Sequence, residues 1–335
     1  MRRLAVLVAG AALALAGAWL AARHYLDTPL LTGTAARIVN IEPGASLTAS
    51  AESMAAQGVL DHPRVFAWYA RLRGDGRSIQ AGEYSVAPGT TPRALLDQLV
   101  SGRVLLHSLT VVEGWTFREL LAALHAQPAV ARTLGESDGA AVMAALGEPG
   151  RHPEGLFFPE TYHFPRGTSD LDLLRQARAL MDEQLAGAWA ERAAGLPFET
   201  SYEALILASI VEKETALEGE RPLIAGVFVR RLERGMRLQT DPSVIYGIGD
   251  GFDGDIRRRD LNQDTPYNTY TRAGLPPTPI ALPGAASLAA VMHPADGETL
   301  YFVATGAGDG SHYFSTTLEE HNEAVRRFLA RQGSQ

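Results

Sequence analysis

The chain has 335 residues, a net charge of −8, 46% hydrophobic residues and no cysteine. This length allows about two domains with cores of their own, and the ordinary apolar fraction excludes disorder over most of the chain. The mild acidity without a basic tail disfavours nucleic acid as a partner, and the lack of cysteine excludes disulfides, thiolate zinc sites and cysteine nucleophiles.

The N-terminus carries a candidate membrane anchor. The 19 uncharged residues from Leu4 to Ala22 would form a helix about 28 Å long, which matches the hydrocarbon thickness of a bilayer. Arg2 and Arg3 precede this run, so the positive-inside rule predicts a single span with a cytoplasmic N-terminus. We expect residues 1–25 to form a cytoplasmic tip and transmembrane anchor, with the remainder outside the cytoplasm. Small residues near the end of the run leave a cleaved signal peptide as the alternative.

The next part of the chain reads as a tether followed by repeated small units. Residues 26–37 are mixed in polarity and interrupted by Pro and Gly, which predicts a tether. A strand, a turn with a Ser or Thr cap, and a helix then recur three times, starting at Ile38, Tyr84 and Leu109. This repetition indicates an α+β fold in which short strands and helices share one core.

Two aromatic groups each have two interpretations. Val65, Trp68, Tyr69 and Leu72 have helical spacing, which is typical of a core-facing stripe and less often of a sugar platform. The cluster at 157–164 holds four aromatic residues between prolines, which predicts a rigid loop or short strand. Its aromatic rings would either fill the core or form a stacking wall for sugar rings.

A helix with an unusual end is predicted in the middle of the chain. Thr200 and Glu203 have the spacing of a capping box, so the helix begins at Thr200. Its first two turns, Ala204 to Val211, are apolar on every side, which indicates complete burial. The helix then presents the EKE triplet at 212–214, so carboxylates would be held rigidly at the rim of a core.

Spacing favours one carboxylate of this triplet as an acid. Glu214 lies one turn beyond the bulky Ile210 and Val211, whereas Glu212 lies over smaller, partly polar residues. Burial against apolar side chains raises the pKa of a carboxyl group, which a general acid needs near neutral pH. Glu214 is therefore the better candidate, and Glu212 is the alternative.

Two later segments carry polar residues that could contact a ligand. Gln239, Thr240 and Asp241 come directly before a proline, where a turn would expose them. Asn268 and Tyr270 open a segment with four prolines in its second half. Such a segment is stiffer than a simple connection needs, so we interpret it as a functional loop.

Other motifs favour structural roles or are absent. Arg230, Arg231 and Arg234 lie near the end of a predicted helix, where cations complement the helix dipole, so we interpret them as structural. No histidine pair has HxH or HExxH spacing, so we expect no metal site. The GxSxG and Walker signatures are absent from the sequence.

Four motifs in series resemble those of the YceG-like endolytic murein transglycosylase family. They are ASIVEKET (208–215), RLERGMRLQTDPSVIYG (231–247), YNTYTRAGLPPTPIALPG (267–284) and HYFSTTLEEHN (312–322). The likeness spans most of the chain from about residue 38. Behind the N-terminal transmembrane helix, it implies a small LysM-like α+β domain over 38–105 and a larger mixed α+β YceG-like catalytic domain over 106–330.

The resemblance also implies an activity. The expected enzyme sits in the inner membrane, faces the periplasm and cleaves inside peptidoglycan glycan strands, leaving a 1,6-anhydro-N-acetylmuramic acid end. The family's catalytic Glu falls in the EKE triplet, which we assign to Glu214 with Glu212 as the alternative. The residues expected to bind the sugars are Gln239, Thr240, Asp241, Asn268 and Tyr270. No cofactor is expected, and the partners would be glycan strands, the membrane and cell-wall synthesis proteins.

Two other functions stay open on the residues alone. A glycoside hydrolase normally needs two carboxylates, and Asp241 could be the second. A lytic transglycosylase needs only one, because the muramic acid C6 hydroxyl attacks its own anomeric carbon and no water is activated. The third possibility is a peptidoglycan-binding protein without activity, for which a buried helix ending in carboxylates would have no purpose.

Overall fold

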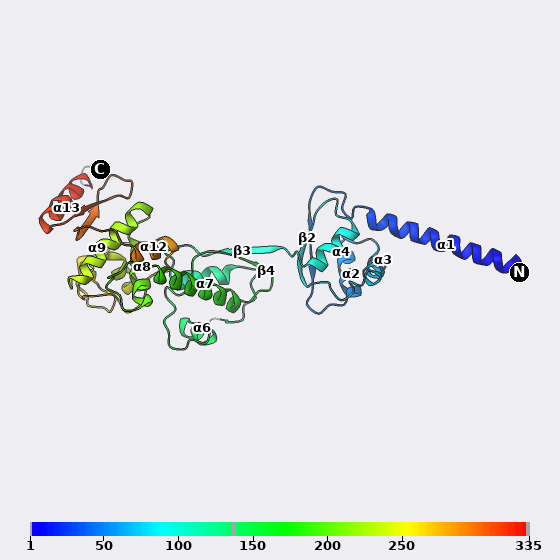
Figure 1. Cartoon of the computed structure of the whole chain (residues 1–335), viewed down its shortest axis with the longest axis horizontal. Coiled ribbons are helices and arrows are strands. Elements are labelled where there is room, and N and C mark those ends of the chain that lie inside the picture. The colour runs from blue at the N-terminus through cyan, green and yellow to red at the C-terminus, as the bar shows by residue number, and fades with distance from the viewer. Residues whose placement is uncertain (1, 136–137, 333–335) are drawn as a thin grey trace. The chain divides into compact units, whose positions relative to one another are not determined.

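The chain divides into two compact units (Figure 1). A computed structural model describes residues 2–135 and 138–332. Unit 1 consists of residues 1–107 and 163–167, and unit 2 of residues 108–162 and 168–335. Met1 of the expected cytoplasmic tip and residues 136–137 of the expected catalytic domain lie outside the described residues.

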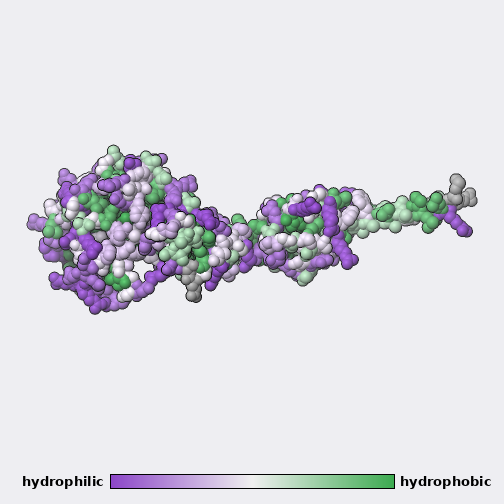
Figure 2. Space-filling model, turned by 90° about the horizontal axis from the view of Figure 1, so that it is seen from below, coloured by the Kyte–Doolittle hydropathy of each residue, from purple (hydrophilic) through white to green (hydrophobic). Residues whose placement is uncertain are grey.

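Unit 1 begins with α1, Arg2–Asp27. Within the described residues, α1 is the helix that is long and apolar enough to cross a membrane. Figure 2 shows hydrophobic residues along most of this helix. The structure therefore agrees with a helical membrane anchor in this part of the chain.

The rest of unit 1 is a small α+β core. Its elements are β1 Arg37–Ile41, α2 Leu47–Ala56, α3 Pro63–Leu72, β2 Gly82–Val86 and α4 Pro92–Ser101. β1 and β2 are antiparallel, with Arg37 opposite Val86 and Ile41 opposite Gly82. The side chains of Ser46 and Thr91 cap α2 and α4, which explains why these helices begin where they do.

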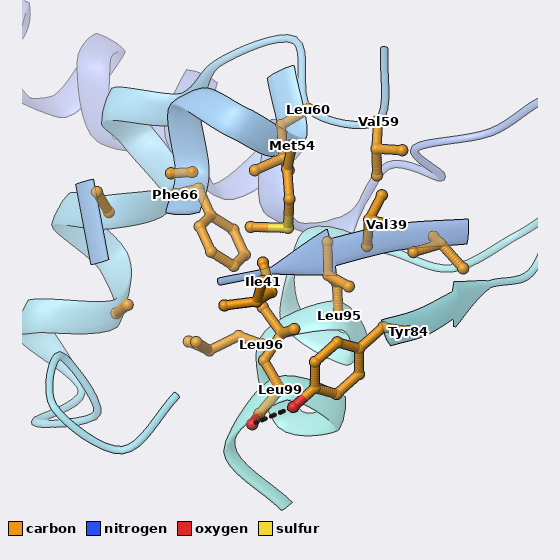
Figure 3. Close-up of a cluster of buried hydrophobic side chains, with 14 of the residues drawn as sticks. Val39, Ile41, Met54, Val59, Leu60, Phe66, Tyr84, Leu95, Leu96 and Leu99 are labelled. Carbon is orange, nitrogen blue, oxygen red and sulfur yellow. Dashed lines mark hydrogen bonds between the residues drawn. The ribbon is translucent and has the colours of Figure 1, made fainter. Parts of the chain in front are cut away.

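The core of unit 1 is formed by side chains from its strands and its helices. Val39 and Ile41 of β1 meet Met54 of α2, Phe66 of α3 and Leu95 of α4, and all five are at most 3% exposed (Figure 3). The alternation of buried residues along β1 places one face of the two-stranded sheet against the helices.

The first half of the segment expected to be a tether, 26–37, packs against unit 1. Leu26 and Leu31 are buried in the core of unit 1. The backbone N–H of Leu30 also donates to the carbonyl of Thr90 at 2.8 Å. The two leucines find apolar partners in the core, so the chain joins the folded unit directly after α1.

The prediction of a buried stripe on α3 is wrong for two of its four residues. Tyr69 is buried, but Trp68 and Leu72 are 49% and 69% exposed, and Val65 is partly buried. α3 instead fills the core with a neighbouring face that includes Phe66. Helical spacing groups residues on one side but does not say which side meets the core.

Two strands join the units. β3 Leu106–Thr110 and β4 Thr161–Pro165 pair with each other, and the chain passes from one unit to the other along them. The aromatic residues at 157–164 are at most 7% exposed. Their role as core is confirmed, and they form no stacking wall for sugars.

Unit 2 is mostly helical and surrounds α8. Its helices are α5 Phe117–Ala126, α6 Gly139–Ala145, α7 Asp170–Ala190, α8 Ser201–Glu214, α9 Arg221–Glu233, α10 Asp241–Ile248, α11 Arg258–Asn262, α12 Ala285–Met292 and α13 Leu318–Gln332, with short 3₁₀ turns η1 Glu218–Glu220 and η2 Gly249–Gly251. The helices α7, α9, α10 and α12 all pack against α8.

A β-hairpin completes unit 2. β5 Tyr301–Ala304 and β6 His312–Ser315 are antiparallel, with Tyr301 opposite Ser315. α13 packs against both strands. The mixture of short sheets and helices confirms the expected α+β class, while the LysM-like character of the first domain stays a prediction.

Candidate functional site

The site is built on the end of α8. The capping box is present, because the Thr200 hydroxyl accepts from the Glu203 N–H and the Glu203 side chain accepts from the Thr200 N–H. Residues 204–211 are buried, so neighbouring helices hold this helix on all sides. A helix fixed in this way presents its last residues in defined positions.

The three residues of the EKE triplet bind three different segments. Glu212 is 6% exposed and accepts from the N–H of Gly284 at 3.0 Å. The Lys213 ammonium donates to the carbonyl of Gly114 at 3.1 Å. Glu214 accepts a hydrogen bond from the Thr240 hydroxyl. Glu212 therefore serves the start of α12, and only Glu214 faces the turn that precedes α10.

Glu214 has the electrostatic character of a proton donor. Burial raises the pKa of its carboxyl group to about 7. The hydrogen bond from Thr240 opposes this shift, and the negative charge of Asp241 adds to it. A pKa in this range lets Glu214 hold or release a proton near neutral pH, which suits a group that both gives and takes a proton.

Glu214 lies in a pocket of about 490 Å³. The pocket is also lined by Gln239 from the turn before α10, by Asp241 at the first position of α10, and by Tyr270 from the proline-rich loop. Its opposite side comes from β5, β6 and α13, which contribute Tyr301, His312 and Asn322 among others. Four of the seven sequence candidates thus meet in one cavity.

Asp241 and Tyr270 form a fixed pair in this pocket. The Tyr270 hydroxyl donates to Asp241 Oδ1 at 2.5 Å. Burial and this hydrogen bond both raise the pKa of Tyr270, so its hydroxyl stays protonated as a donor. Asp241 itself is exposed at the pocket wall and carries the negative charge that Glu214 faces.

Gln239 has the backbone of a constrained residue. Its φ angle is +51°, and among the described residues it is the one residue other than glycine with a positive φ. This conformation is uncommon for a residue with a side chain, and it is found where the surrounding structure holds the backbone in place. Here the Gln239 N–H donates to the carbonyl of Thr269 at 3.2 Å.

Two sequence candidates, Asn268 and Thr240, are buried and form hydrogen bonds within the protein. Asn268 is buried, and its amide donates to the carbonyls of Asp260, Leu261 and Gln263, so it ties the loop together. Thr240 is also buried and reaches the pocket through its hydrogen bond to Glu214. These hydrogen bonds let Asn268 support the loop and Thr240 support the acid, and direct sugar binding by either residue stays a prediction.

Arg231 is a site residue that sequence reasoning missed. Its guanidinium donates to the carbonyl of Leu238 at 2.6 Å and to that of Leu300 at 2.7 Å. It also lies 5.2 Å from the ring centre of Tyr301, whose other neighbour is the stacked His321 ring at 5.3 Å. Arg231 thus fixes the Gln239 turn and one wall of the pocket, where a helix-dipole role alone was expected.

His312 and its neighbours were also missed as site residues. The His312 ring lies 2.7 Å from a carboxylate oxygen of Glu220, and its backbone N–H donates to the other oxygen at 2.9 Å. His312, His321 and Asn322 all belong to the fourth sequence motif, HYFSTTLEEHN. Their polar types were visible in the sequence, but the pairing of β5 with β6 and the packing of α13 on this hairpin bring them to the pocket of Glu214.

No cluster of His, Asp and Glu that could hold a metal ion is found within residues 2–135 and 138–332. The arrangement is instead a polar, partly open pocket with a carboxyl group that can be protonated at neutral pH, a second carboxylate and several hydrogen-bond donors. Such a site defines a protein that performs acid–base chemistry on a polar, hydroxyl-rich ligand.

Comparison with known proteins identifies the family. The YceG-like family model matches residues 39–327, and the chain belongs to this family. The endolytic murein transglycosylase of Bacillus subtilis is 29% identical over 87% of this chain and 84% of its own length. That of Streptococcus pneumoniae D39 is 28% identical over 94% of this chain, which spans 63% of the length of that relative.

A solved structure agrees with this assignment. The crystal structure of a YceG-like protein from Listeria monocytogenes matches with a TM-score of 0.55 and 30% identity. The match covers 87% of this chain and 99% of the other. The family resemblance of the four sequence motifs is thus confirmed.

Proposed function

We propose that this protein is an endolytic murein transglycosylase that cleaves the bond between N-acetylmuramic acid and N-acetylglucosamine within glycan strands. The observation that carries the proposal is a protonatable Glu214 in a polar pocket, in a chain whose relatives of that name match over most of its length. The activity makes it a lyase of peptidoglycan with a role in cell-wall biogenesis.

Glu214 performs both proton transfers in the proposed mechanism. In the protonated state it gives its proton to the glycosidic oxygen as the bond from that oxygen to C1 of muramic acid breaks. The C6 hydroxyl of the same sugar then attacks C1, and the Glu214 carboxylate takes the hydroxyl proton. The attack is intramolecular, so the enzyme needs no second group to activate a nucleophile.

Neighbouring groups stabilise the charge that develops during the reaction. Positive charge grows at C1 and the ring oxygen, and the Asp241 carboxylate at the pocket wall is placed to offset it. The Thr240 hydroxyl stabilises Glu214 once it has lost its proton. Gln239 and Tyr270 supply hydrogen-bonding groups for sugar hydroxyls in the pocket.

A hydrolase is the competing function, because Asp241 lines the same pocket as Glu214. The two reactions leave different products: water gives a reducing end, whereas internal attack gives a 1,6-anhydro end. The hydrogen bond from Tyr270 occupies one oxygen of Asp241 and favours a fixed electrostatic role. The transglycosylase reaction is therefore the better supported of the two.

The proposed location is the inner membrane, with α1 as a single span, the N-terminus in the cytoplasm and both units in the periplasm. The apolar α1 and the extracytoplasmic position of peptidoglycan support this arrangement. Unit 1 is proposed as the LysM-like domain. The proposed partners are glycan strands and the membrane, together with proteins of cell-wall synthesis.

Mass spectrometry of muropeptides tests the function. Full-length protein in detergent is incubated with purified peptidoglycan, and soluble products are scored for anhydro and reducing ends. We expect anhydro ends on internal fragments. Reducing ends would establish a hydrolase, and a complete lack of products in conditions where the Bacillus relative is active would establish a protein that only binds.

A further inference from the structure

The outer face of α3 is apolar and uncovered. Trp68 and Leu72 are 49% and 69% exposed, and the partly buried Val65 lies on the same side. The inner face of the helix, with Phe66 and Tyr69, is already buried in the core of unit 1. α3 is therefore apolar on both sides, which is unusual for a helix that lies in water.

This face borders the outer end of α1. A hollow of about 580 Å³ lies between the two helices. Leu15, Trp19 and Ala22 line it from α1, and Arg64, Val65 and Trp68 line it from α3. An adjoining hollow of about 510 Å³ continues along the face to Leu72.

The position of this hollow along α1 sets its depth in a membrane. If α1 spans the bilayer with the apolar run that ends at Ala22, then Leu15 lies seven residues, or about 10 Å, below the outer boundary of the hydrocarbon layer. The helix is joined to unit 1 without a flexible linker, because Leu26 is buried in the core and Asp27 forms an ion pair with Arg93 at 2.6 Å.

We propose that α3 is a second membrane contact, with its outer face embedded in the periplasmic leaflet beside α1. The proposal rests on the proposed span by α1. Lipid acyl chains fill the hollow and cover Val65, Trp68 and Leu72. The unit is thereby held against the membrane at two points, which fixes its orientation as well as its distance.

The charged residues at the hollow match this placement. Arg64 lines it from the start of α3, and the Arg23 guanidinium lies 5.4 Å from the ring centre of Trp19. At the proposed depth both guanidinium groups reach the phosphate level of anionic lipids while their stems cover apolar surface. Trp19 and Trp68 take the interfacial position that tryptophan prefers in membranes.

Spin labels can measure the depth of this face directly. The chain has no cysteine, so single cysteines can be introduced without other changes. Full-length Trp68→Cys and Leu72→Cys carry a nitroxide in nanodiscs of phosphatidylcholine and phosphatidylglycerol at 3:1. The accessibility of each label is measured once with oxygen and once with a water-soluble nickel chelate as the relaxation agent. For both labels we expect the accessibility to oxygen to be at least three times the accessibility to the chelate.

Two further positions separate the possible results. Leu13→Cys lies inside the proposed span and should be the deepest label. Leu106→Cys is 55% exposed and apolar but lines neither hollow, so it should report water. Equal melting temperatures of all four variants establish that the exposed substitutions leave the fold intact.

Each other outcome overturns the proposal in a distinct way. If the Leu13 label is deep but the labels at 68 and 72 are accessible to the chelate, then α1 spans the membrane and α3 does not contact it. If the labels at 68 and 72 are accessible to neither agent, then another protein molecule, such as a second copy of the chain, covers this face. A water-exposed Leu13 label would overturn the anchor and the contact together.

Discussion

Glu214 is a buried carboxyl group that can hold or release a proton near neutral pH. Its burial at the end of α8 raises the pKa to about 7, and the charge of Asp241 adds to that effect. We expect Glu214→Gln to lower glycan cleavage about 10³-fold or more, because an amide gives no proton to the leaving oxygen. The rate of anhydro-muropeptide release measures this loss.

The matched control is Glu212→Gln, which changes the neighbouring carboxylate of the same helix. Glu212 accepts from the Gly284 N–H and also lies 3.7 Å from the Arg221 guanidinium; an amide oxygen can still accept that hydrogen bond, so only the ion pair is lost. Activity should stay within about tenfold of the unchanged protein. If Glu212→Gln is inactive and Glu214→Gln is active, then Glu212 is the catalytic acid and Glu214 is not.

The raised pKa also predicts how stability depends on pH. A folded-state pKa of about 7, above the ordinary 4.5, means that the folded protein binds this proton more tightly than the unfolded chain does. Stability contributed by protonated Glu214 is complete below pH 4.5 and falls as the pH rises to 7. Glu214→Gln should therefore raise the free energy of unfolding at pH 8 by on the order of 1–3 kcal/mol and change it little at pH 4.

Glu154 offers a control for this measurement. Its buried carboxyl group also has a pKa raised to about 7, and it accepts from the Phe117 N–H at 2.8 Å, outside the pocket. Glu154→Gln should show a similar dependence of the stability gain on pH, while glycan cleavage continues. Urea unfolding at pH 4 and pH 8 measures the stability gain of each variant. A gain that is equal at the two pH values would contradict the raised pKa of the carboxyl group that was replaced.

Asp241 separates the two enzymatic mechanisms. In the transglycosylase it supplies a fixed negative charge, so Asp241→Asn should lower the rate by roughly tenfold and leave the product anhydro-terminated. In a hydrolase the loss would be orders of magnitude, because no group would activate water. If Asp241→Asn loses all activity and added azide restores it, the single-carboxylate mechanism is wrong.

At the scale of elements, the end of α9 holds the site together through Arg231. Arg231→Met would leave the buried carbonyls of Leu238 and Leu300 without their donor, which we expect to cost about 2–4 kcal/mol in the free energy of unfolding. The Gln239 turn would shift, and cleavage should fall at least tenfold even at temperatures where the variant is folded.

Arg234→Met is the matched comparison for Arg231→Met. Arg234 is exposed at the C-terminal end of the same helix. Its loss removes only a helix-dipole interaction, worth about 0.3–1 kcal/mol. Thermal unfolding and muropeptide release, measured for both variants, test whether Arg231 contributes more to stability and activity than Arg234 does. Equal effects of the two substitutions would mean that Arg231, like Arg234, acts on the dipole alone.

The elements of the site differ in how far the sequence predicts them. The extent of α8 and the burial of its first turns follow from the capping box and an apolar run, both of which are local signals. The position of Arg231 against Leu300 depends on two segments almost seventy residues apart, and no local pattern contains it. The burial of Asn268 could not be predicted either, because buried amides inside a loop and exposed amides beside it have the same sequence pattern.

The same limit applies to α3. The spacing of Trp68 and Leu72 correctly indicates one face of a helix, but a core-facing stripe was predicted, with a sugar platform as the alternative. A membrane beside the domain makes a third kind of surroundings available. The proximity of α1 to this face, which only the structure supplies, changes the interpretation.

At the scale of the whole molecule, the anchor and the folded units should be separable. Residues 3–24 of α1 are mostly exposed, whereas Leu26 is buried in the core of unit 1 and Asp27 forms an ion pair with Arg93. We expect a chain that lacks residues 1–25 to stay in the supernatant after ultracentrifugation and to cleave peptidoglycan. Weak, reversible binding to vesicles should remain through α3.

The double substitution Trp68→Ser and Leu72→Ser is the control for that weak binding. In the shortened chain it should abolish vesicle binding, whereas Leu106→Ser should not. A shortened chain that stays with membranes after an alkaline wash would contradict a single anchor. N-terminal sequencing of the mature full-length protein distinguishes the anchor from a cleaved signal peptide.

The triplet at the end of α8 has a consequence for the variation that this chain can tolerate. Glu212, Lys213 and Glu214 each serve a different neighbour, in directions about 100° apart around the helix. One residue inserted or deleted between Thr200 and Glu212 would rotate all three onto the wrong neighbours at once. The turn at 306–310 lies outside regular structure and could change length. In functional variants of this protein, insertions and deletions should therefore occur in such turns and be absent between Thr200 and Glu214.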